Sequence, residues 1–350
     1  MLSRLLIYGA YGYTGELIAR MAAARGARPI LAGRKAARLR PLAESLGLPW
    51  RAFALDASDI DAHLAEVDVV LHCAGPFSVT ARPMVEACLR QRAHYLDITG
   101  EIDVFELLAQ LDTVAEERGV MVMPGVGFDV VPTDCLAARV ALKVPSATHL
   151  DIAFRGLGAI SHGTATTMLG KLDQGGLVRR DGRLVRVRAA HAVRSFDFGR
   201  GPVTCMTVPW GDIATAWRTT QIPNITTYMA APRSLRLGAM LSRHLGWLLR
   251  RAAVRDFLQS RVDSAPAGPT EQQRRAGRSF VFAEARDART GRSFASRLVA
   301  PEGYTFTALA ALEIATRAHD GDAPTGFQTP AGAYGPDLVL AVEGVERFDV

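Results

Sequence analysis

The sequence has few cysteines and no long apolar run. Its four cysteines, Cys73, Cys88, Cys135 and Cys205, form no C-x-x-C pair, and no His, Cys and Asp residues have zinc-ligand spacing. We therefore expect no metal site, and reduced, buried thiols in a cytoplasmic protein. No stretch reaches the roughly 18 to 20 apolar residues of a membrane-spanning helix. No signal peptide precedes the first expected strand.

Aromatic residues are also scarce, at 7% of the 350 residues, and they are not interleaved with basic ones. The formal net charge of +6 therefore does not indicate a nucleic-acid-binding module. An anionic cofactor would account for part of it. With 49% hydrophobic and 22% charged residues, the chain is suited to one or two globular domains with a proper core.

A glycine-rich turn follows the first expected strand, at residues 4–8. Gly9, Gly12 and Gly15 have the spacing G-x-x-G-x-x-G, and helical periodicity continues through residues 17–22. In such a strand–turn–helix the glycines allow a tight turn, close approach of the pyrophosphate, and packing of helix against strand. The helix N-terminus offers N–H groups to the phosphates. The expected dinucleotide-binding residues here are Gly9, Tyr11, Gly12, Tyr13, Thr14 and Gly15.

The second expected strand, residues 29–32, lacks the Asp or Glu with which an NAD site usually binds the ribose 2′-OH. Arg34, Lys35 and Arg38 follow instead. A guanidinium can pair with a 2′-phosphate in bidentate fashion. We therefore predict NADP(H), with Arg34 as the main anchor and Lys35 or Arg38 assisting. The alternative is a solvated, basic helix start.

Strand and helix patterns alternate through the first 135 residues, which predicts a parallel, doubly wound sheet of the Rossmann type. Further strands are expected at residues 50–56, 67–74, 94–98 and 120–123, with helices at 60–65, 84–92 and 104–118. In such sheets ligands bind at the carboxyl ends of the strands. The loops there supply the remaining expected cofactor residues: Asp56 near adenine, Ala74, Gly75, Pro76 and Phe77 beside the nicotinamide ribose, and Gly127 and Phe128 beside the nicotinamide.

The pattern changes after about residue 140. Polar alternation predicts strands at residues 150–155, 183–188, 278–285 and 293–299, and a strong helix is expected at 304–317. The predicted fold class is therefore α/β: a Rossmann-type parallel sheet followed by an α+β domain with a mixed or antiparallel sheet. We assign residues 1–138 to an NADP-binding domain, 139–325 to a substrate or dimerisation domain, and 326–350 to a segment that returns to the cofactor domain.

Several motifs resemble those of one family. They are Gly9–Gly15, Ala32-Gly33-Arg34, Cys73–Phe77, Tyr95–Glu101, Gly127–Asp134, His162-Gly163-Thr164, Gly268-Pro269-Thr270, Gly303-Tyr304 and Thr329-Pro330-Ala331. In this order they resemble the saccharopine dehydrogenase-like oxidoreductases, in particular the trans-acting enoyl reductase branch. The resemblance implies an N-terminal NADP-binding domain, a C-terminal mixed domain and a homodimer. It leaves the reaction open, because the family includes amino-acid dehydrogenases and enoyl reductases.

The catalytic candidates are Tyr95, Asp129 and His162, because a nicotinamide reductase usually needs a proton donor. Tyr95 shares a strand face with Asp97, although Asp97 and Glu101 are alternatively helix caps. Asp129, like Asp134, is alternatively a capping residue. Histidine as a residue type is suited to acid–base chemistry near neutral pH. His162 stands where the family commonly has glycine, so it is either an acid or an inconsequential substitution. Tyr304 is a weaker candidate.

Two further patterns bear on function. None of the seven tyrosines has a lysine four residues later, which excludes the Tyr-x-x-x-Lys mechanism of short-chain dehydrogenases. Residues 233–255 read as a basic amphipathic helix or pair of helices. That segment is either a lid or peripheral membrane contact, or a surface that packs on the domain or a dimer partner.

These observations predict an NADPH-dependent reductase of a C=C bond in a hydrophobic small-molecule substrate. One alternative is a saccharopine-type amino-acid or imine dehydrogenase, whose basic site would use Arg155, Arg218 or Arg233. The other is a non-catalytic NADP-binding protein at a membrane surface.

Overall fold

The computed structural model describes residues 2–56, 58–156, 161–163, 165–166, 175–233, 236, 251–264 and 266–350. The chain forms two compact units. Unit 1 comprises Met1–Val131 and Tyr304–Glu343, and unit 2 comprises Pro132–Gly303 and Gly344–Val350. The predicted borders after residues 138 and 325 differ from these. Tyr304–Glu343 belongs to unit 1, and Gly344–Val350 does not return to it. The roles predicted for the two domains stay predictions.

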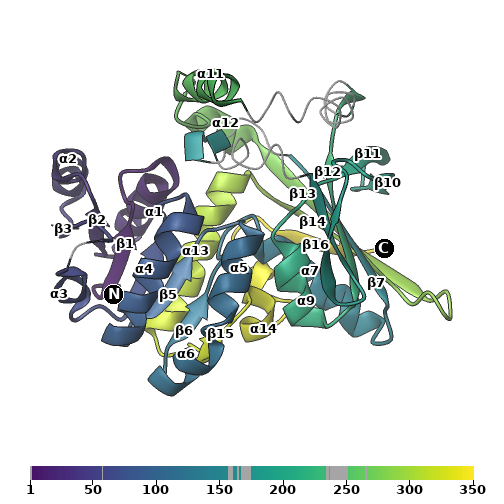
Figure 1. Ribbon diagram of the computed structural model, residues 1–350, viewed down its shortest axis with the longest axis horizontal. Helices are drawn as coiled ribbons and strands as arrows, with labels where there is room; N and C mark the ends of the chain where they lie inside the picture. The colour runs from purple at the N-terminus through teal and green to yellow at the C-terminus, as the bar shows by residue number, and fades with distance from the viewer. Residues whose placement is uncertain are drawn as a thin grey trace. The chain divides into compact units, whose positions relative to one another are not determined.

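Unit 1 contains a seven-stranded parallel sheet with the order β15-β6-β5-β4-β1-β2-β3, which Figure 1 shows from β15 to β3. Its strands are β1 (Leu5–Tyr8), β2 (Ile30–Gly33), β3 (Trp50–Ala52), β4 (Val69–His72), β5 (His94–Asp97), β6 (Met121–Met123) and β15 (Gly326–Phe327). The order reverses between β1 and β4, as in a Rossmann fold. The predicted α/β fold class is confirmed.

The helices of unit 1 follow the strands in alternation. They are α1 (Tyr13–Ala24), α2 (Ala36–Leu46), α3 (Ile60–Leu64), α4 (Phe77–Gln91), α5 (Ile102–Ala109), α6 (Asp112–Arg118), α13 (Gly303–His319), α14 (Pro330–Tyr334) and the 3-10 helix η1 (Leu338–Ala341). The single helix expected at 104–118 is two helices. The helix expected from residue 84 begins at Phe77, directly after the loop that closes β4.

Burial explains why the parallel sheet could be predicted from the sequence. Every residue of β1, β2 and β4 is buried, because both faces of a parallel sheet are covered by helices. The core includes Tyr8, Leu31 and Phe105, each at most 1% exposed. Such a core holds the strand ends, and hence the loops that follow them, in fixed positions.

Unit 2 contains a second, mixed sheet with the order β10-β11-β12-β7-β13-β14-β16, and β8 pairs with both β12 and β9. Its strands are β7 (His149–Arg155), β8 (Gly176–Arg180), β9 (Arg183–Val187), β10 (Val193–Asp197), β11 (Pro202–Thr207), β12 (Asn224–Ala230), β13 (Arg278–Arg286), β14 (Ser293–Pro301) and β16 (Glu346–Asp349). Its helices are α7 (Val131–Lys143), α9 (Asp212–Thr220), α11 (Ala252–Asp263) and α12 (Glu271–Ala276). The β7–β12 pair is parallel and the other pairs are antiparallel, so the sheet is mixed.

Candidate cofactor and active site

The glycine turn and the loop after β4 meet where the strand order of the unit 1 sheet reverses. Gly9 has φ +82°, and a Cβ there would lie 2.9 Å from the Ala74 Cβ. The Gly9 N–H donates to the Ala32 carbonyl oxygen at 2.8 Å, which ties the turn to β2. Only glycine fits this crowded, left-handed position. The turn therefore requires glycine at this position, and dinucleotide binding here stays a prediction.

The other two glycines shape the start of α1. A Cβ on Gly15 would lie 2.3 Å from the Gly9 carbonyl oxygen, so glycine is required for the helix to pack under the turn. Gly12 precedes the helix in an extended conformation, and no side chain caps the first turn in this described part of unit 1. Tyr11, Gly12, Tyr13 and Thr14 are half-buried. The N-terminal N–H groups of α1 thus suit a phosphate ligand.

Three basic side chains stand just past β2. Arg34, Lys35 and Arg38 are all exposed, and none has an ion pair with a carboxylate among the residues that the structure describes. The Arg38 guanidinium lies 4.9 Å from the centre of the Tyr11 ring. That ring lies over Gly33, where a Cβ would come within 2.6 Å of it. Unpaired positive charge beside the glycine turn fits a 2′-phosphate.

Tyr8 lies close enough to both Arg34 and Asp56 for their charges to act on its hydroxyl. Burial raises the pKa of Tyr8 to about 12, Tyr11 and Asp56 add to the rise, and the positive charge of Arg34 opposes it. The Tyr8 hydroxyl donates to the Phe53 carbonyl oxygen at 3.0 Å. Arg34 and Asp56 therefore lie near the same tyrosine, at the edge where adenosine contacts were expected.

The loop Ala74-Gly75-Pro76-Phe77 is held by a buried carboxylate. Gly75 and Pro76 are exposed, and the peptide bond between them is cis. The Phe77 N–H donates to Glu101 Oε1 at 2.9 Å, and Glu101 is only 4% exposed. Glu101 occupies the N-cap position of α5, but its side chain makes no cap hydrogen bond. Its carboxylate instead fixes the loop, a contact that the sequence pattern did not reveal.

Asp97 organises the ends of β5 and β6. Its Oδ2 accepts from the Tyr95 hydroxyl at 2.8 Å, and its Oδ1 accepts from the N–H groups of Thr99 at 2.9 Å and Gly125 at 3.0 Å. Burial raises the pKa of Asp97 to about 6, although these hydrogen bonds oppose the rise. Burial also raises the pKa of Tyr95. The Tyr95 hydroxyl, on a fully buried side chain, is thus engaged with Asp97.

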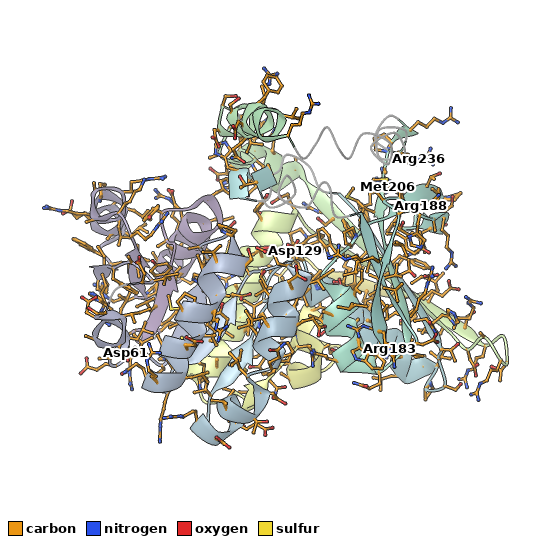
Figure 2. The ribbon with its side chains drawn as sticks, viewed as in Figure 1. Asp61, Asp129, Arg183, Arg188, Met206 and Arg236 are labelled. Atoms are coloured by element: carbon orange, nitrogen blue, oxygen red, sulfur yellow. The ribbon has the colours of Figure 1, made fainter. Side chains whose placement is uncertain are left out.

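Asp129 differs from these carboxylates. Its side chain, labelled in Figure 2, is half-buried, and burial raises its pKa to about 6. Within the described part of the chain, its carboxylate has no hydrogen bond or ion pair. A Cβ on Gly100 would lie 2.5 Å from Asp129 Oδ2, so this glycine makes room for the carboxylate. A carboxyl group with such a pKa can exchange a proton near neutral pH.

Phe128 and Gly127 are positioned by α13. The Phe128 N–H donates to Thr307 Oγ1 at 3.0 Å, and a Cβ on Gly127 would lie 2.8 Å from Thr307 Cγ2. The Phe128 and Phe306 rings pack edge-on, 5.9 Å apart. Tyr304, also on α13, packs edge-on against Tyr13 at 5.0 Å. Thr307, 179 residues from Phe128, carried no recognisable signal in the sequence.

The remaining candidates belong to unit 2. The His162 N–H donates to the Ala267 carbonyl oxygen at 3.2 Å, and its side chain is half-buried. Asp134 accepts from the Thr219 hydroxyl at 2.6 Å. Arg155 lines a pocket of about 50 Å³ with Arg200, Phe198, Gly201 and Phe280. Most of segment 233–255 lies outside the described residues.

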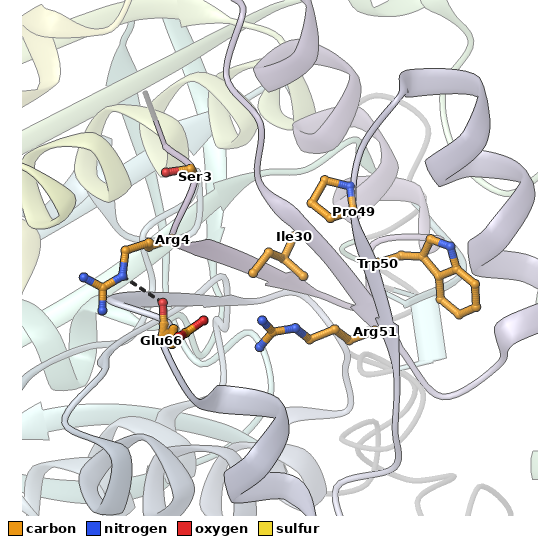
Figure 3. A pocket seen from close by; sticks show the side chains of 7 residues that line it. All are labelled: Ser3, Arg4, Ile30, Pro49, Trp50, Arg51 and Glu66. Carbon is orange, nitrogen blue, oxygen red and sulfur yellow. Dashed lines mark hydrogen bonds between the residues drawn. The ribbon is translucent and has the colours of Figure 1, made fainter.

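A larger pocket, of about 570 Å³, lies at the other end of the unit 1 sheet (Figure 3). It is lined by Ser3, Arg4, Ile30, Pro49, Trp50, Arg51 and Glu66. These residues stand at or just before the amino ends of β1 to β4, whereas the glycine turn stands at the carboxyl ends. In Figure 3 the Trp50 ring points away from the space between Arg4 and Arg51. Size alone does not make this pocket part of the candidate site.

Two classes of site are missing from the described residues. No three His, Cys, Asp or Glu side chains are grouped so that they would hold a metal ion within these ranges. Every helix in the described part of the chain is too short or too polar to cross a lipid bilayer.

Comparison with known families identifies the N-terminal part. Residues 5–123 match the family described as saccharopine dehydrogenase NADP binding domain. The matched region contains β1 to β6, the glycine turn and the cations after β2. The match confirms the predicted family resemblance and NADP(H) as the cofactor of the domain.

Several relatives are similar to the first part of the chain. Trans-acting enoyl reductases from Mycobacterium tuberculosis and Mycobacterium leprae are 34% identical to it over 139 residues, which is 37% of this chain. The match spans only 33% of the length of these relatives. A saccharopine dehydrogenase (L-Glu forming) from Saccharomyces cerevisiae has a similar fold, with a TM-score of 0.65, 13% identity and 99% of each chain covered.

Proposed function

We propose that the chain is an NADPH-dependent oxidoreductase that reduces a C=C bond in a hydrophobic, acyl or polyketide-like substrate. The observation that carries the cofactor assignment is the group of unpaired cations Arg34, Lys35 and Arg38 beside the glycine turn. The enoyl assignment rests on the similarity to trans-acting enoyl reductases over the first part of the chain.

Each end of the cofactor has a proposed set of contacts. The N–H groups of the glycine turn and of α1 would hold the pyrophosphate, and Arg34, with Lys35 or Arg38, would hold the 2′-phosphate. Asp56 would lie near the adenosine. The exposed loop Ala74–Phe77, with Gly127 and Phe128, would border the nicotinamide and its ribose.

Asp129 is the proposed proton donor. Bound NADPH would supply the hydride. The Asp129 carboxyl would supply the proton to the carbon next to the substrate carbonyl, so that a hydride and a proton together reduce the double bond. Its raised pKa and its unpartnered, half-buried carboxylate support this role. Tyr95 would orient Asp97 rather than donate a proton, and His162 is the alternative acid.

A fluorescence titration with NADPH and NADH tests the cofactor assignment. Because charge-assisted hydrogen bonds contribute about 1.5–3 kcal/mol, Arg34→Ala should weaken NADPH binding roughly ten- to a hundredfold and leave NADH binding unchanged. Arg40→Ala is the matched control, because Arg40 is exposed on α2 but paired with Glu44 at 2.6 Å. Equal losses for the two nucleotides would contradict the assignment.

Enone reduction tests the proton donor. Asp129→Asn should lower the turnover rate about 10²- to 10⁴-fold while the dissociation constant of NADPH stays unchanged. In the wild type, turnover should fall as the pH rises through about 6, since the acid is then lost. If His162→Ala abolishes turnover and Asp129→Asn does not, His162 is the acid.

One observation favours the saccharopine-type alternative. Arg155 and Arg200 line the same small pocket of unit 2, and neither has an ion pair within the ranges that the structure describes. Two such guanidinium groups suit a carboxylate of an amino-acid substrate. Oxidation of amino acids, or reduction of imines, that Arg155→Gln abolishes would favour this reaction over enone reduction.

Cytoplasmic localisation, homodimerisation and a membrane-surface contact through residues 233–255 also stay proposals. Sedimentation of the purified protein would test the dimer. Flotation with anionic liposomes would test the surface contact.

A further inference from the structure

A buried histidine at the end of β4 has no part in the reaction proposed above. His72 is fully buried, and its Nε2 lies 2.9 Å from Thr80 Oγ1. Thr80 stands in the first turn of α4, and its Oγ1 also lies 2.6 Å from the Ala74 carbonyl oxygen and 3.1 Å from that of Pro76. One chain of hydrogen bonds thus connects the end of β4 with the loop Ala74–Phe77.

The donors and acceptors of this chain determine the protonation of His72. The Thr80 hydroxyl has one hydrogen, and the carbonyl groups of Ala74 and Pro76 can only accept. The hydroxyl therefore donates to a carbonyl oxygen, by distance that of Ala74, and it accepts from His72. His72 must carry its proton on Nε2. Burial lowers its pKa to about 3, so the ring is neutral near physiological pH.

The surroundings of the ring show why a histidine stands here. His72 packs against Phe77 edge-on at 5.4 Å, and against Tyr8 and Tyr95 at 5.5 and 6.2 Å. Its Nδ1 is buried and has no hydrogen-bond partner among the described residues. An apolar side chain would fill this space without leaving a buried nitrogen unpaired. The Nε2–H bond to Thr80 is therefore the contact that only a polar side chain supplies.

We propose that His72 and Thr80 are positioning residues that hold the Ala74 carbonyl and so set the position of the loop at the nicotinamide end of the cofactor. The inference rests on the proposed function, because it assumes that this loop borders the nicotinamide ribose. Glu101 holds the other end of the same loop through the Phe77 N–H at 2.9 Å. Between these two anchors the exposed Gly75 and Pro76 present their backbone to the ligand.

Thr80→Val and Thr80→Ser form the matched pair that tests the proposal. Valine keeps the shape but removes the hydroxyl, whereas serine keeps it. We expect Thr80→Val to weaken NADPH binding about tenfold and to leave binding of 2′,5′-ADP, which lacks the nicotinamide end, unchanged. Thr80→Ser should bind both ligands as the wild type does. Equal loss of both ligands in Thr80→Val, or no loss of either, would overturn the proposal.

A second measurement examines the histidine directly. Long-range ¹H–¹⁵N spectra of the wild type should show a proton on Nε2 of His72 and a bare Nδ1, and Thr80→Val should change the Nε2 signal. A proton on Nδ1 would refute the proposed chain of hydrogen bonds from His72 through Thr80 to the Ala74 carbonyl. His72→Gln retains an N–H donor and should keep NADPH affinity, whereas His72→Leu should lose about tenfold. If the wild type binds 2′,5′-ADP but not NADPH, or neither ligand, the proposed function fails first.

Discussion

The Asp97 carboxylate should make the protein less stable as the pH rises through 6. Asp97 is fully buried, and its pKa in the folded protein is about 6 instead of the ordinary 3.8. A carboxyl group whose pKa is raised by folding stabilises the fold below pH 3.8, and this contribution is lost as the pH rises through 6. We therefore expect Asp97→Asn to remove part of the pH dependence of unfolding.

The pKa difference gives the magnitude. A shift of about two pKa units corresponds to about 3 kcal/mol once the group is fully ionised. Between pH 4.5 and pH 7.5 the loss is about 2 kcal/mol, because ionisation of the unfolded chain has begun at the lower pH. Asparagine keeps the Oδ1 that accepts from Thr99 and Gly125, and it changes the contact with Tyr95. That change adds an offset that is the same at both pH values.

Urea denaturation of wild type and variant at pH 4.5 and pH 7.5 measures this effect. The free energy of unfolding of Asp97→Asn, relative to wild type, should rise by about 2 kcal/mol at the higher pH. Asp61→Asn is the control: the hydrogen bond from Arg90 lowers the pKa of Asp61, so this carboxyl group is largely ionised at both pH values and its difference from wild type should hardly change between them. Asp61 lies on α3, and Figure 2 shows it well apart from Asp129, the proposed proton donor. If the difference in unfolding free energy between Asp97→Asn and wild type stays constant across this pH range, the reasoning is refuted.

Two predictions concern the packing of the cofactor crevice. Gly15→Ala places a Cβ 2.3 Å from the Gly9 carbonyl oxygen, so the turn must shift, and we expect calorimetry to show at least about tenfold weaker NADPH binding. Binding at wild-type affinity would mean that the turn adapts freely. Glu101→Leu leaves the Phe77 N–H without its acceptor and should lower the free energy of unfolding by about 1–3 kcal/mol in urea, whereas Glu101→Gln retains Oε1 and should lose less. Equal losses for the two variants would show that the Phe77 contact is unimportant.

The sequence predicted the parallel sheet because its strands are buried on both faces. Leu5–Tyr8 and Val69–His72 are continuous apolar or aromatic runs that end at glycine-containing loops. The strands β10, β11 and β12 of unit 2 were not predicted. Their burial is irregular over five to seven residues, with neither a continuous buried run nor a regular alternation, and this is a weaker signal than a continuous run.

Long-range contacts explain what the sequence could not reveal about the candidate site. The early start of α4 was hidden because Pro83 lies inside the helix and reads as a break. The bond from Phe77 to Glu101 spans 24 residues, and that from Phe128 to Thr307 spans 179. Such pairs are set by the topology of the sheet, so no local spacing predicts them.

Three acidic residues, at the end of β5 and in the loops that follow β5 and β6, show why burial patterns alone would not have separated their roles. Asp97, Glu101 and Asp129 follow or end neighbouring parallel strands, and each was open to a capping or a catalytic interpretation. Their hydrogen bonds distinguish them: Asp97 accepts from three donors, and Glu101 accepts from the Phe77 N–H. Asp129 has no such donor in the described part of the chain. Protonation would weaken Asp97 and Glu101 as acceptors for the N–H groups that hold the loops, whereas Asp129 can take up and release a proton without disturbing them. These contacts are the grounds on which we propose Asp129 as the residue that exchanges a proton, and Asp97 and Glu101 as supports of the loops.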